Sequence, residues 1–378
     1  MATGPGDHPL VLGIETSCDD TACAVVDSAG RVLASVVSSQ LAAHHPYSGV
    51  VPEIASREHL KNWPAVSAET LARSGVALRE VDAVAATRGP GLVGSLLVGL
   101  SLGKAIAYAL GLPFHAVHHL EGHLYSPFLA PPPAAAPGSP ETLALPPPAE
   151  PVPDRFAGLV VSGGHSSLFR VADGEVSTLA ETRDDAIGEA FDKVGRRLGL
   201  PYPQGLRVDE LAEEGERAEV PFSEAPGAAR FAVARCGDDS LDFSYSGLKS
   251  QALLAIEALE RRGIATDLGV GGGPAPEVLA LLAAFRRAAV GQVLDRLARL
   301  HRRQPLGLLA VSGGVAANRL LRREAAAWAA AEGVELRLVP LVYAGDNAAM
   351  IAHAALLRLR RGRADDPFAA EAGSRIPL

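Results

Sequence analysis

Short apolar runs alternate with polar turns along the chain, and this pattern predicts two similar series of strands and helices. The first series begins with a strand at Leu10, which ends in the polar turn 15–20, and continues with strands over 21–27 and 31–39. A helix over 56–74, a strand over 83–87, an apolar helix over 95–111 and a strand over 114–117 come next, before a helix that begins near His119. From residue 156 the same order starts again, with strands over 156–161, 166–173 and 175–182.

This internal repeat predicts an α/β protein made of two copies of a β-β-β-α-β-α unit. Two such units that face each other would form a cleft, with the turn between the first and second strands of each unit directed into it. We expect one domain over residues 9–130 plus 345–378 and a second over 155–344. The stretch between them, 131–154, is a Pro-rich insertion whose proline content and lack of periodicity prevent a packed element.

Composition narrows the class of protein. The 378 residues carry a net charge of -8, which argues against a protein that coats nucleic acid non-specifically, although clusters of arginine near 286–303 and 358–363 could form local basic patches. Three cysteines do not make a disulfide framework and fit a reducing compartment. The chain opens without a leader-like sequence and has no charge-free run of eighteen or more apolar residues, so we expect a cytoplasmic protein that does not enter membranes.

The sequence His118-His119-Leu120-Glu121-Gly122-His123 contains a candidate metal site. On a helix, His119 and His123 project from one face and lie within reach of one ion. Glu121 is rotated by about 200° from each of them and should point away. This arrangement differs from the zinc-peptidase patterns, in which a glutamate beside the metal activates water. Histidines that merely cap or line a helix are an equally good interpretation of the spacing alone.

Three strand ends carry further candidate chemistry. Ser162-Gly163-Gly164 and Ser312-Gly313-Gly314 each follow a buried strand, and such glycines allow backbone N–H groups to converge on an anion. The turn 15–20 carries hydroxyls and carboxylates, which could receive a phosphate and its metal, although an ordinary Asx-type turn would have the same residues.

Taken together, ten stretches resemble the bacterial tRNA adenosine threonylcarbamoyltransferases of the TsaD family, formerly called O-sialoglycoprotein endopeptidases, within the actin/Hsp70/sugar-kinase superfamily. Any one stretch is a weak signal, but they occur in the order of the family and cover nearly the whole chain. They are GIETSCDDT, GVVPEIASR, GPGLVGSLLVG, HHLEGH, LVVSGGHS, GEAFDKVGRRLGL, YPQG, FSYSGLKS, SGGVAANRLLR and GDNAAM.

The resemblance implies a duplicated actin-like ATPase fold and an enzyme that moves a threonylcarbamoyl group from threonylcarbamoyl-AMP to N6 of A37, the adenosine beside the anticodon, in tRNAs that read ANN codons. It implies one Fe²⁺ or Zn²⁺ per subunit, held by His119, His123 and Asp346, and an adenylate or ATP in the cleft. The implied nucleotide-binding residues are Val160, Val161, Ser162, Gly163, Gly164, Asp192, Gly205, Asp209 and Asn318. Asp19 is our candidate for the group that accepts or orients the proton of the attacking amine.

The implied partners are tRNA, a smaller actin-like paralogue of the TsaB type, a P-loop ATPase of the TsaE type and a separate synthase that supplies the donor. Two positions depart from the family pattern, because Asp20 stands where a glutamate is expected and Ser48 where many relatives have glycine. Other functions on the same fold stay open at this point: an ATP-dependent sugar or acetate kinase, a metallopeptidase, or a scaffold without catalytic activity.

Overall fold

The computed structural model describes residues 9–130, 149–218, 231, 236, 240–269 and 273–378. Most of the predicted Pro-rich insertion, residues 131–148, lies outside the described residues. By its internal contacts the chain divides into two compact units, which are treated separately below. Unit 1 comprises Met1–Pro153 and Val339–Leu378, and unit 2 comprises Asp154–Leu338.

Among its described residues, unit 1 contains one five-stranded sheet in the order β3-β2-β1-β4-β5. The first three strands are antiparallel neighbours, and β4 and β5 continue the sheet in parallel with β1. The strands are β1 (Val11–Glu15), β2 (Asp20–Val26), β3 (Val32–Ser39), β4 (Ala83–Gly89) and β5 (Phe114–His118). Its helices are α1 (Leu41–His44), α2 (Pro52–Ser74), α3 (Val93–Leu110), α4 (His119–Tyr125) and α10 (Ala348–Arg360).

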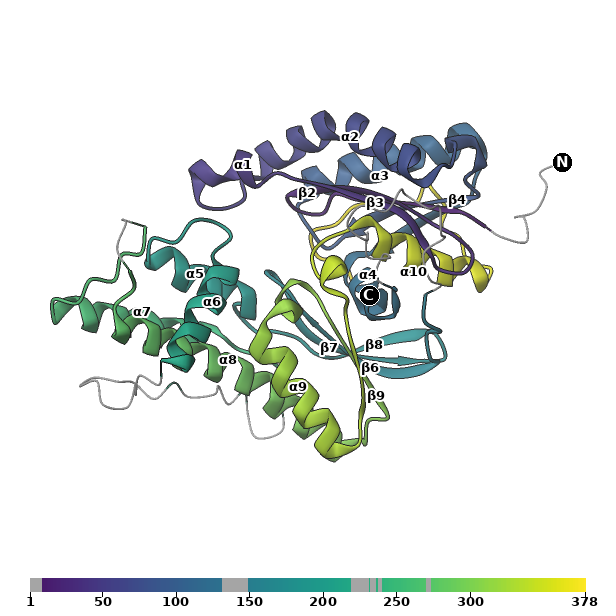
Figure 1. Cartoon of the computed structure of the whole chain (residues 1–378). Helices are drawn as coiled ribbons and strands as arrows, with labels where there is room; N and C mark the ends of the chain where they lie inside the picture. The colour runs from purple at the N-terminus through teal and green to yellow at the C-terminus, as the bar shows by residue number, and fades with distance from the viewer. Residues whose placement is uncertain (1–8, 131–148, 219–230, 232–235, 237–239, 270–272) are drawn as a thin grey trace, which may run out of the picture. The chain divides into compact units, whose positions relative to one another are not determined.

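The burial of the strands explains this layering. Every residue of β1, and all of β2 except its first, is buried, as expected for central strands with helices on both faces. β3, at the edge, alternates between buried and more exposed positions. Helices α2 and α3 cover one face of the sheet, and α10 packs on the other, where it also contacts α4 (Figure 1). Unit 1 is therefore a three-layer sandwich.

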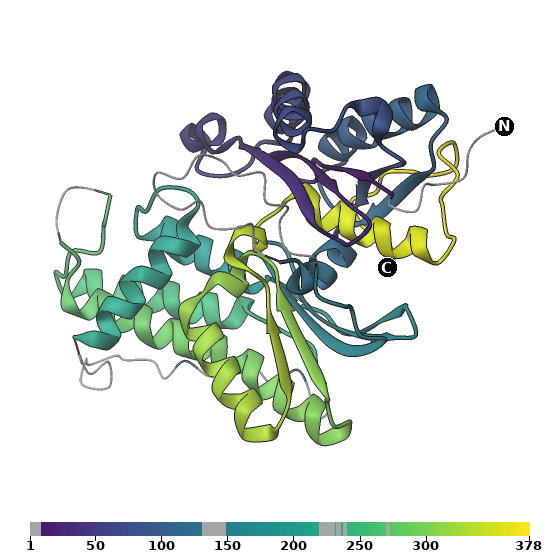
Figure 2. The same cartoon turned by 45° about the vertical axis from the view of Figure 1, so that its right-hand side comes forward.

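Unit 2 repeats the strand order of unit 1. Its described residues include a five-stranded sheet in the order β10-β9-β6-β7-β8, with β6, β7 and β8 antiparallel and β9 and β10 parallel to β6. Helices α5 to α8 pack against one another, and α9 contacts both α8 and β10 (Figure 2). The strands are β6 (Arg155–Val161), β7 (Ser166–Ala172), β8 (Glu175–Ala180), β9 (Leu308–Ser312) and β10 (Glu335–Leu338). The helices are α5 (Ile187–Arg197), α6 (Gln204–Arg217), α7 (Ser246–Arg261), α8 (Pro276–Arg303) and α9 (Arg319–Glu332).

Numbered within each unit, both sheets have the strand order 3-2-1-4-5, and this confirms the predicted duplicated α/β fold. Three helices differ from the sequence-based expectation. Helix α2 begins at Pro52 rather than near residue 56, with the proline in the first turn, where its missing N–H costs nothing. The short helix α1 and the longer helix α6 were not predicted at all.

Helix α3 is long and apolar enough to cross a membrane by length and composition, and it alone meets that test among the described residues. Of its 18 residues, 33% are buried. A helix that packs on a sheet meets the same test, and α3 packs on β4 and α2.

Candidate metal centre and nucleotide turns

Two of the predicted metal ligands lie on a short helix that starts directly after a buried strand. β5 ends at His118, and α4 begins with His119. The ring of His118 caps this helix, because its Nδ1 accepts the N–H of Leu120 at 3.2 Å. The spacing alone had left open that these histidines cap a helix. In the structure, His118 has this capping role. His119 and His123 lie one turn apart, with ring centroids 4.7 Å apart and ring planes at 87°.

Close packing of α4 on α10 brings the third predicted ligand to this pair. A Cβ at Gly122 would lie 2.8 Å from Cδ1 of Ile351, so the two helices touch closely at this glycine. Asn347 caps α10 by accepting a backbone N–H of the first turn at 3.0 Å, and this fixes the loop that carries Asp346. Asp346 is thereby held beside His119 and His123.

The resulting group fits one metal ion. Nε2 of His123 lies 3.1 Å, and Nε2 of His119 3.5 Å, from Oδ1 of Asp346. One ligand atom from each residue lies within 4.8 Å of the others. In a tetrahedral site with bonds of about 2 Å, ligand atoms lie about 3.3 Å apart, which matches the two distances to Asp346. Two imidazoles and one carboxylate therefore suit Fe²⁺ or Zn²⁺ and leave coordination positions for other ligands.

A buried glutamate orients His119 from behind. Oε2 of Glu15 lies 3.1 Å from Nδ1 of His119 and accepts the hydroxyl of Thr87 at 2.6 Å. Ser17 donates its backbone N–H to the other carboxylate oxygen of Glu15, and its hydroxyl lies 3.2 Å from the same His119 nitrogen. A carboxylate that receives the second N–H of a ligand histidine fixes its tautomer and raises its basicity. Sequence reasoning missed Glu15, which it placed only in a turn.

The electrostatics of the group favour a cation. Burial opposes a charge on His119, but the carboxylates of Asp346 and Glu15 outweigh it and raise its pKa to about 9. Burial likewise opposes the charge of Glu15, yet the attraction of His119 lowers the pKa of that carboxyl. His123 differs, because burial lowers its pKa. A metal-bound imidazole must be free of its proton on the bonded nitrogen, so a divalent ion would take the place of the proton that His119 holds.

Glu121 is not part of this group. Its carboxylate pairs with the guanidinium of Arg358, whose Nε lies 3.0 Å from Oε1 and whose Nη2 contacts Oε2. Arg358 also donates to the carbonyl of Ala116 at 3.1 Å and so ties α10 to β5. The glutamate therefore holds the helix layer together, and it lacks the free carboxylate that a peptidase would use to activate water.

The turn between β1 and β2 carries the candidate proton acceptor Asp19, and Asp20 is the first residue of β2. Burial and the charges of Asp346 and Asp19 raise the pKa of Asp20 to about 7. The pKa of Asp20 therefore depends in part on Asp346, which is one of the three predicted metal ligands. A pKa near neutrality suits a group that takes up and releases protons, and sequence reasoning had treated Asp20 only as a departure from the family pattern.

In unit 2, the predicted nucleotide-binding turn follows β6, which contains Val160 and Val161. Gly163 and Gly164 have open space where a Cβ would stand, with no neighbouring heavy atom of the described residues within 4 Å. Helix α5 starts against this turn, because the N–H of Glu189 donates to the carbonyl of Gly163 at 3.1 Å. The parallel neighbour β9 ends in the second Ser-Gly-Gly turn, where Gly313 has a φ of +89°.

The other predicted nucleotide-binding residues form two hydrogen-bonded pairs. Oδ1 of Asp192 accepts the backbone N–H of Gly205 at 2.8 Å, and burial raises the pKa of this carboxyl. Oδ1 of Asp209 accepts from Asn318 Nδ2 at 2.7 Å and from Nη1 of the fully buried Arg286 at 2.8 Å. Arg286 had been noted only as one of several arginines on its helix. Its charge neutralises Asp209 in the interior.

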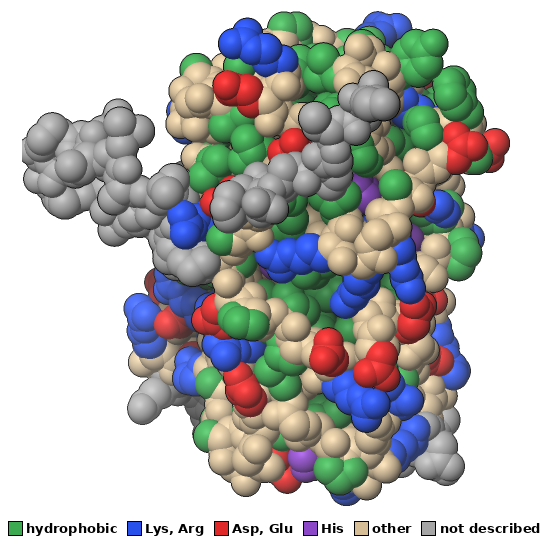
Figure 3. Space-filling view, turned by 90° about the vertical axis from the view of Figure 1, so that its right-hand side faces the viewer, with side chains coloured by type: hydrophobic (Ala, Val, Ile, Leu, Met, Phe, Trp, Pro, Cys, Tyr) green, Lys and Arg blue, Asp and Glu red, His purple; other side chains and the backbone are tan. Residues whose placement is uncertain are grey.

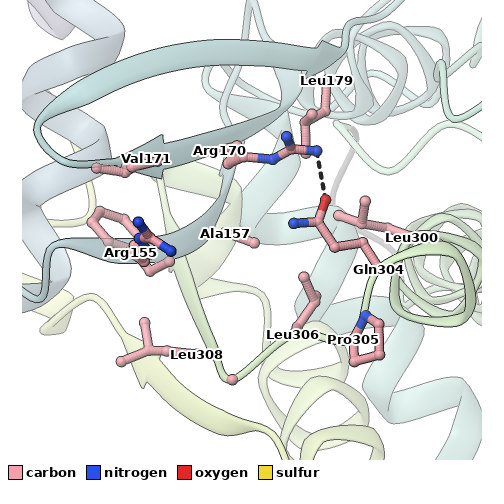
Figure 4. A pocket seen from close by; sticks show the side chains of 13 residues that line it. Arg155, Ala157, Arg170, Val171, Leu179, Leu300, Gln304, Pro305, Leu306 and Leu308 are labelled. Carbon is pink, nitrogen blue, oxygen red and sulfur yellow. Dashed lines mark hydrogen bonds between the residues drawn. The ribbon is translucent and has the colours of Figure 1, made fainter.

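A depression in unit 2 at the start of β6 lies away from these residues. It has a volume of about 460 Å³ and is lined at the first residues of β6 and β9 and at the end of α8, where Arg170 donates to Gln304 at 2.5 Å (Figure 4). The Ser-Gly-Gly turns follow the last residues of the same strands. The depression is therefore at the opposite edge of the sheet from the predicted nucleotide site.

Fold and site together define the class of protein: an α/β protein with a duplicated actin-like fold and a two-histidine, one-aspartate group able to hold a metal ion. HypF of T. kodakarensis has this fold, with a TM-score of 0.53 and 15% identity over 94% of this chain and 48% of that one. Full-length HypF in its phosphate- and nucleotide-bound form gives a TM-score of 0.53 with 13% identity over 93% and 56% of the two chains. At such low identity the likeness concerns the fold alone.

The chain belongs to the TsaD family, described as tRNA N6-adenosine threonylcarbamoyltransferase, whose sequence profile matches residues 31–353. It is 44% identical over 358 residues to the tRNA N6-adenosine threonylcarbamoyltransferase of Pelobacter propionicus, covering 94% of each chain. The enzyme of the same name from Thermus thermophilus is 42% identical over 372 residues, 97% of this chain and 98% of the relative. These findings confirm the family predicted from the motifs, and with it a transferase of tRNA modification that would bind tRNA.

Proposed function

We propose that this protein transfers the threonylcarbamoyl group of threonylcarbamoyl-AMP to N6 of A37 in tRNAs that read ANN codons and releases AMP. The observation that carries the proposal is the group of His119, His123 and Asp346, backed by Glu15, in a chain of this family. These three residues would hold an Fe²⁺ or Zn²⁺, one per subunit, which would supply Lewis acidity to the oxygens of the donor.

The adenylate half of the donor is assigned to unit 2. The open backbone of Gly163 and Gly164 leaves room for a phosphate beside two successive peptide N–H groups, and the buried carboxyl of Asp192 offers an acceptor for ribose hydroxyls. The full proposed set is Val160, Val161, Ser162, Gly163, Gly164, Asp192, Gly205, Asp209 and Asn318. ATP would occupy the same residues.

For this reaction the protein needs mainly to position the two substrates and to accept a proton. The N6 atom of the adenosine forms a bond to the carbamoyl carbon, and the bond from that carbon to the phosphate oxygen breaks, because AMP is a good leaving group. The proton lost from N6 passes to Asp19 in our assignment. Asp20, with its pKa of about 7, would receive it next or share it.

Assembly with other proteins fits the surface of unit 1. Helix α3 exposes four large side chains, Val93, Leu97, Tyr108 and Leu110, and exposed apolar side chains of this kind favour a protein partner. We assign that role to a smaller actin-like paralogue of the TsaB type, with a P-loop ATPase of the TsaE type completing the assembly and a separate synthase supplying the donor. On the face drawn in Figure 3, acidic and basic side chains stand next to one another, so partners that add basic surface would assist tRNA binding.

We place the protein in the cytoplasm, where tRNA and the donor are available. Its cysteines are consistent with a reducing compartment, because Cys18, Cys23 and Cys236 are free thiols.

Reconstitution tests the proposal. The purified protein, the partner proteins, threonylcarbamoyl-AMP and unmodified tRNA are combined, and digested tRNA is examined by mass spectrometry for N6-threonylcarbamoyladenosine. We expect the modified nucleoside with the natural chain, and a loss of more than about a hundredfold with His119→Ala, because a lost ligand should cost more than a lost group that only orients one. His45→Ala is the matched control, since His45 is exposed in the same unit.

Absence of product from the complete mixture would refute the transfer reaction. Product formed at the natural rate by His119→Ala would refute the metal centre as its site. Phosphorylation of a sugar or of acetate by the same preparation with ATP would instead favour the kinase alternative.

A further inference from the structure

Behind the turn that carries Asp19 lies a buried chain of hydrogen bonds through three side chains, Gln40, His44 and His59, which we call the polar chain. Gln40 is 2% exposed, and the two histidines are 0% exposed. Nδ1 of His59 lies 3.1 Å from Nε2 of Gln40, and Nε2 of His44 lies 3.2 Å from Oε1 of Gln40. A buried polar group destabilises the fold unless it is hydrogen-bonded. The three side chains satisfy one another, so we infer that their hydrogen bonds are a stable part of the folded structure.

The two ends of the polar chain fix the direction of every hydrogen bond in it. At one end, the N–H of Val51 donates to Nδ1 of His44 at 3.3 Å, so Nε2 of His44 carries the proton and donates to Gln40. At the other end, the carbonyl of Cys18 can only accept, so Nε2 of His59 donates to it at 3.0 Å. Nδ1 of His59 is left as the acceptor, and it faces both the hydroxyl of Thr21 and the amide of Gln40. Burial lowers the pKa of His59 and keeps its ring neutral, as this pattern requires.

The polar chain forms hydrogen bonds to consecutive residues of the turn. His59 holds the carbonyl of Cys18, and the backbone N–H of Gln40 donates to the carbonyl of Asp19 at 2.9 Å. The hydroxyl of Thr21 lies 2.8 Å from Nδ1 of His59. The two peptide groups that flank the Cα of Asp19 therefore have their orientation set from outside the turn.

The other side of the same turn belongs to the metal group. Ser17 bonds to Glu15 and lies beside His119, as described above. The segment 17–21 is thus fastened at one end to the group that orients a metal ligand and at the other to the polar chain. A turn held at both ends has little freedom to redirect the carboxylate between them.

We propose that His59 is a positioning residue for transfer: through the carbonyl of Cys18 it holds the turn so that the Asp19 carboxylate faces its substrate. This inference rests on the proposed function. His59 itself touches neither substrate nor reacting atoms in this assignment, and its hydrogen bond from Nε2 is the one that matters.

A pair of substitutions separates the two nitrogens of His59. Glutamine places a donor near the position of Nε2 and loses the acceptor at Nδ1, whereas asparagine keeps a polar atom near Nδ1 and loses the donor to Cys18. We expect His59→Asn to lower kcat for transfer by about ten- to a hundredfold with KM for donor and tRNA unchanged, because small misplacements of a catalytic group have effects of this size. His59→Gln should recover kcat to within about threefold of the natural chain.

Two further measurements make the test specific. In an Asp19→Asn background, His59→Asn should cause no additional loss, since a residue that acts through Asp19 has nothing left to position. Amide hydrogen exchange over residues 17–21 should accelerate in His59→Asn and not in His59→Gln, while bound metal stays the same in both.

Equal kcat values for the two His59 variants, or additive losses in the Asp19→Asn background, would overturn the inference while transfer by the natural chain still supported the proposed function. Failure of the natural chain to transfer would overturn the proposed function instead. In that case the exchange measurement alone would still decide whether His59 holds the turn.

Discussion

The turn after the first strand has opposite chemistry in the two units, although their sheets share one strand order. In unit 1, the turn between β1 and β2 contains hydroxyls and carboxylates, and Glu15 at its start bonds to a predicted metal ligand. In unit 2, the turn between β6 and β7 contains Gly163 and Gly164 with open space around them. The same position in the fold therefore has a negative side chain in one unit and glycine backbone with open space beside it in the other.

This difference indicates how the two units of a duplicated fold can bind different chemical groups. Carboxylates suit a cation and a proton, and backbone N–H groups suit an anionic phosphate. Each turn is also supported in its own way, by Glu15, Ser17 and His59 in unit 1 and by the start of α5 in unit 2. A substitution in one turn should therefore change metal content or proton transfer without changing nucleotide affinity, and the reverse should hold for the other turn.

The largest effect is expected from Asp346→Asn, which keeps the size of a predicted ligand and removes its charge. Metal content, measured by inductively coupled plasma mass spectrometry, should fall from about one ion per chain to a small fraction, and transfer should fall more than about a hundredfold. Asp154→Asn, at an exposed position in unit 2, is the control. Unchanged AMP affinity is expected in both variants. A metal content that survives Asp346→Asn would remove Asp346 from the ligand set.

A smaller effect is expected from Glu15→Gln, because the change leaves all three predicted ligands in place. Loss of the carboxylate that orients His119 should weaken metal affinity by about ten- to a hundredfold. Competition with a chromogenic chelator measures this affinity. Glu53→Gln, on the exposed side of the first turn of α2, serves as the control. Equal affinities of Glu15→Gln and the natural chain would mean that the hydrogen bond to His119 does not stabilise the bound ion.

In unit 2, two glycines of one neighbourhood separate ligand binding from folding. Gly163→Ala adds a methyl group to open space, so the melting temperature should not change, while AMP affinity should fall about tenfold as the methyl group crowds the phosphate. Gly188→Ala places a Cβ 2.6 Å from the carbonyl oxygen of Ser162, so it should lower stability by about 1–3 kcal/mol. Calorimetric titration and thermal unfolding measure the two quantities. Natural AMP affinity in Gly163→Ala would argue against this turn as the phosphate site.

Much of the fold was predictable because its strands are apolar runs between polar turns. Helix α6 was missed because its sequence, QGLRVDELAEEGER, has few apolar residues and many charges. Its buried positions, among them Val208 and Leu211, become clear only when α8 lies against them. The start of α2 was misplaced because the signal for a loop in GVVPE outweighed the preference of proline for a first helical turn.

The candidate site was predictable where spacing carries the information, as with His119 and His123 on one helix. Glu15, Asp20 and His59 were not assigned such roles, because these depend on contacts between residues far apart in the chain. Glu15 meets His119 across 104 residues, and the pKa of Asp20 depends on Asp346. Asp346 itself entered only through the family motif GDN, since a single aspartate before a helix has no spacing that marks it as a ligand.

The smallest effect at neutral pH, and one confined to unit 1, is expected from buried histidines. Among the described residues, the fully buried ring of His115 has no hydrogen-bond partner, and burial lowers its pKa to about 4. The pKa of His115 is lower in the folded state than the unfolded value of about 6.5, so acid favours the unfolded chain, which binds the proton more readily. The free energy of unfolding is therefore undiminished above pH 6.5 and falls as the pH drops toward 4. His115→Leu should remove this loss, which is about 2 kcal/mol at pH 5 and only a few tenths of a kcal/mol at pH 7.

Hydrogen exchange of unit 1 and unit 2 at pH 7 and pH 5 measures this loss of stability. We expect acid to lower the protection factors of amides in the sheet of unit 1 more than those in unit 2, and the substitution to narrow that gap. An equal acid response of both sheets, unaffected by the substitution, would show that the buried histidines of unit 1 do not set its acid sensitivity.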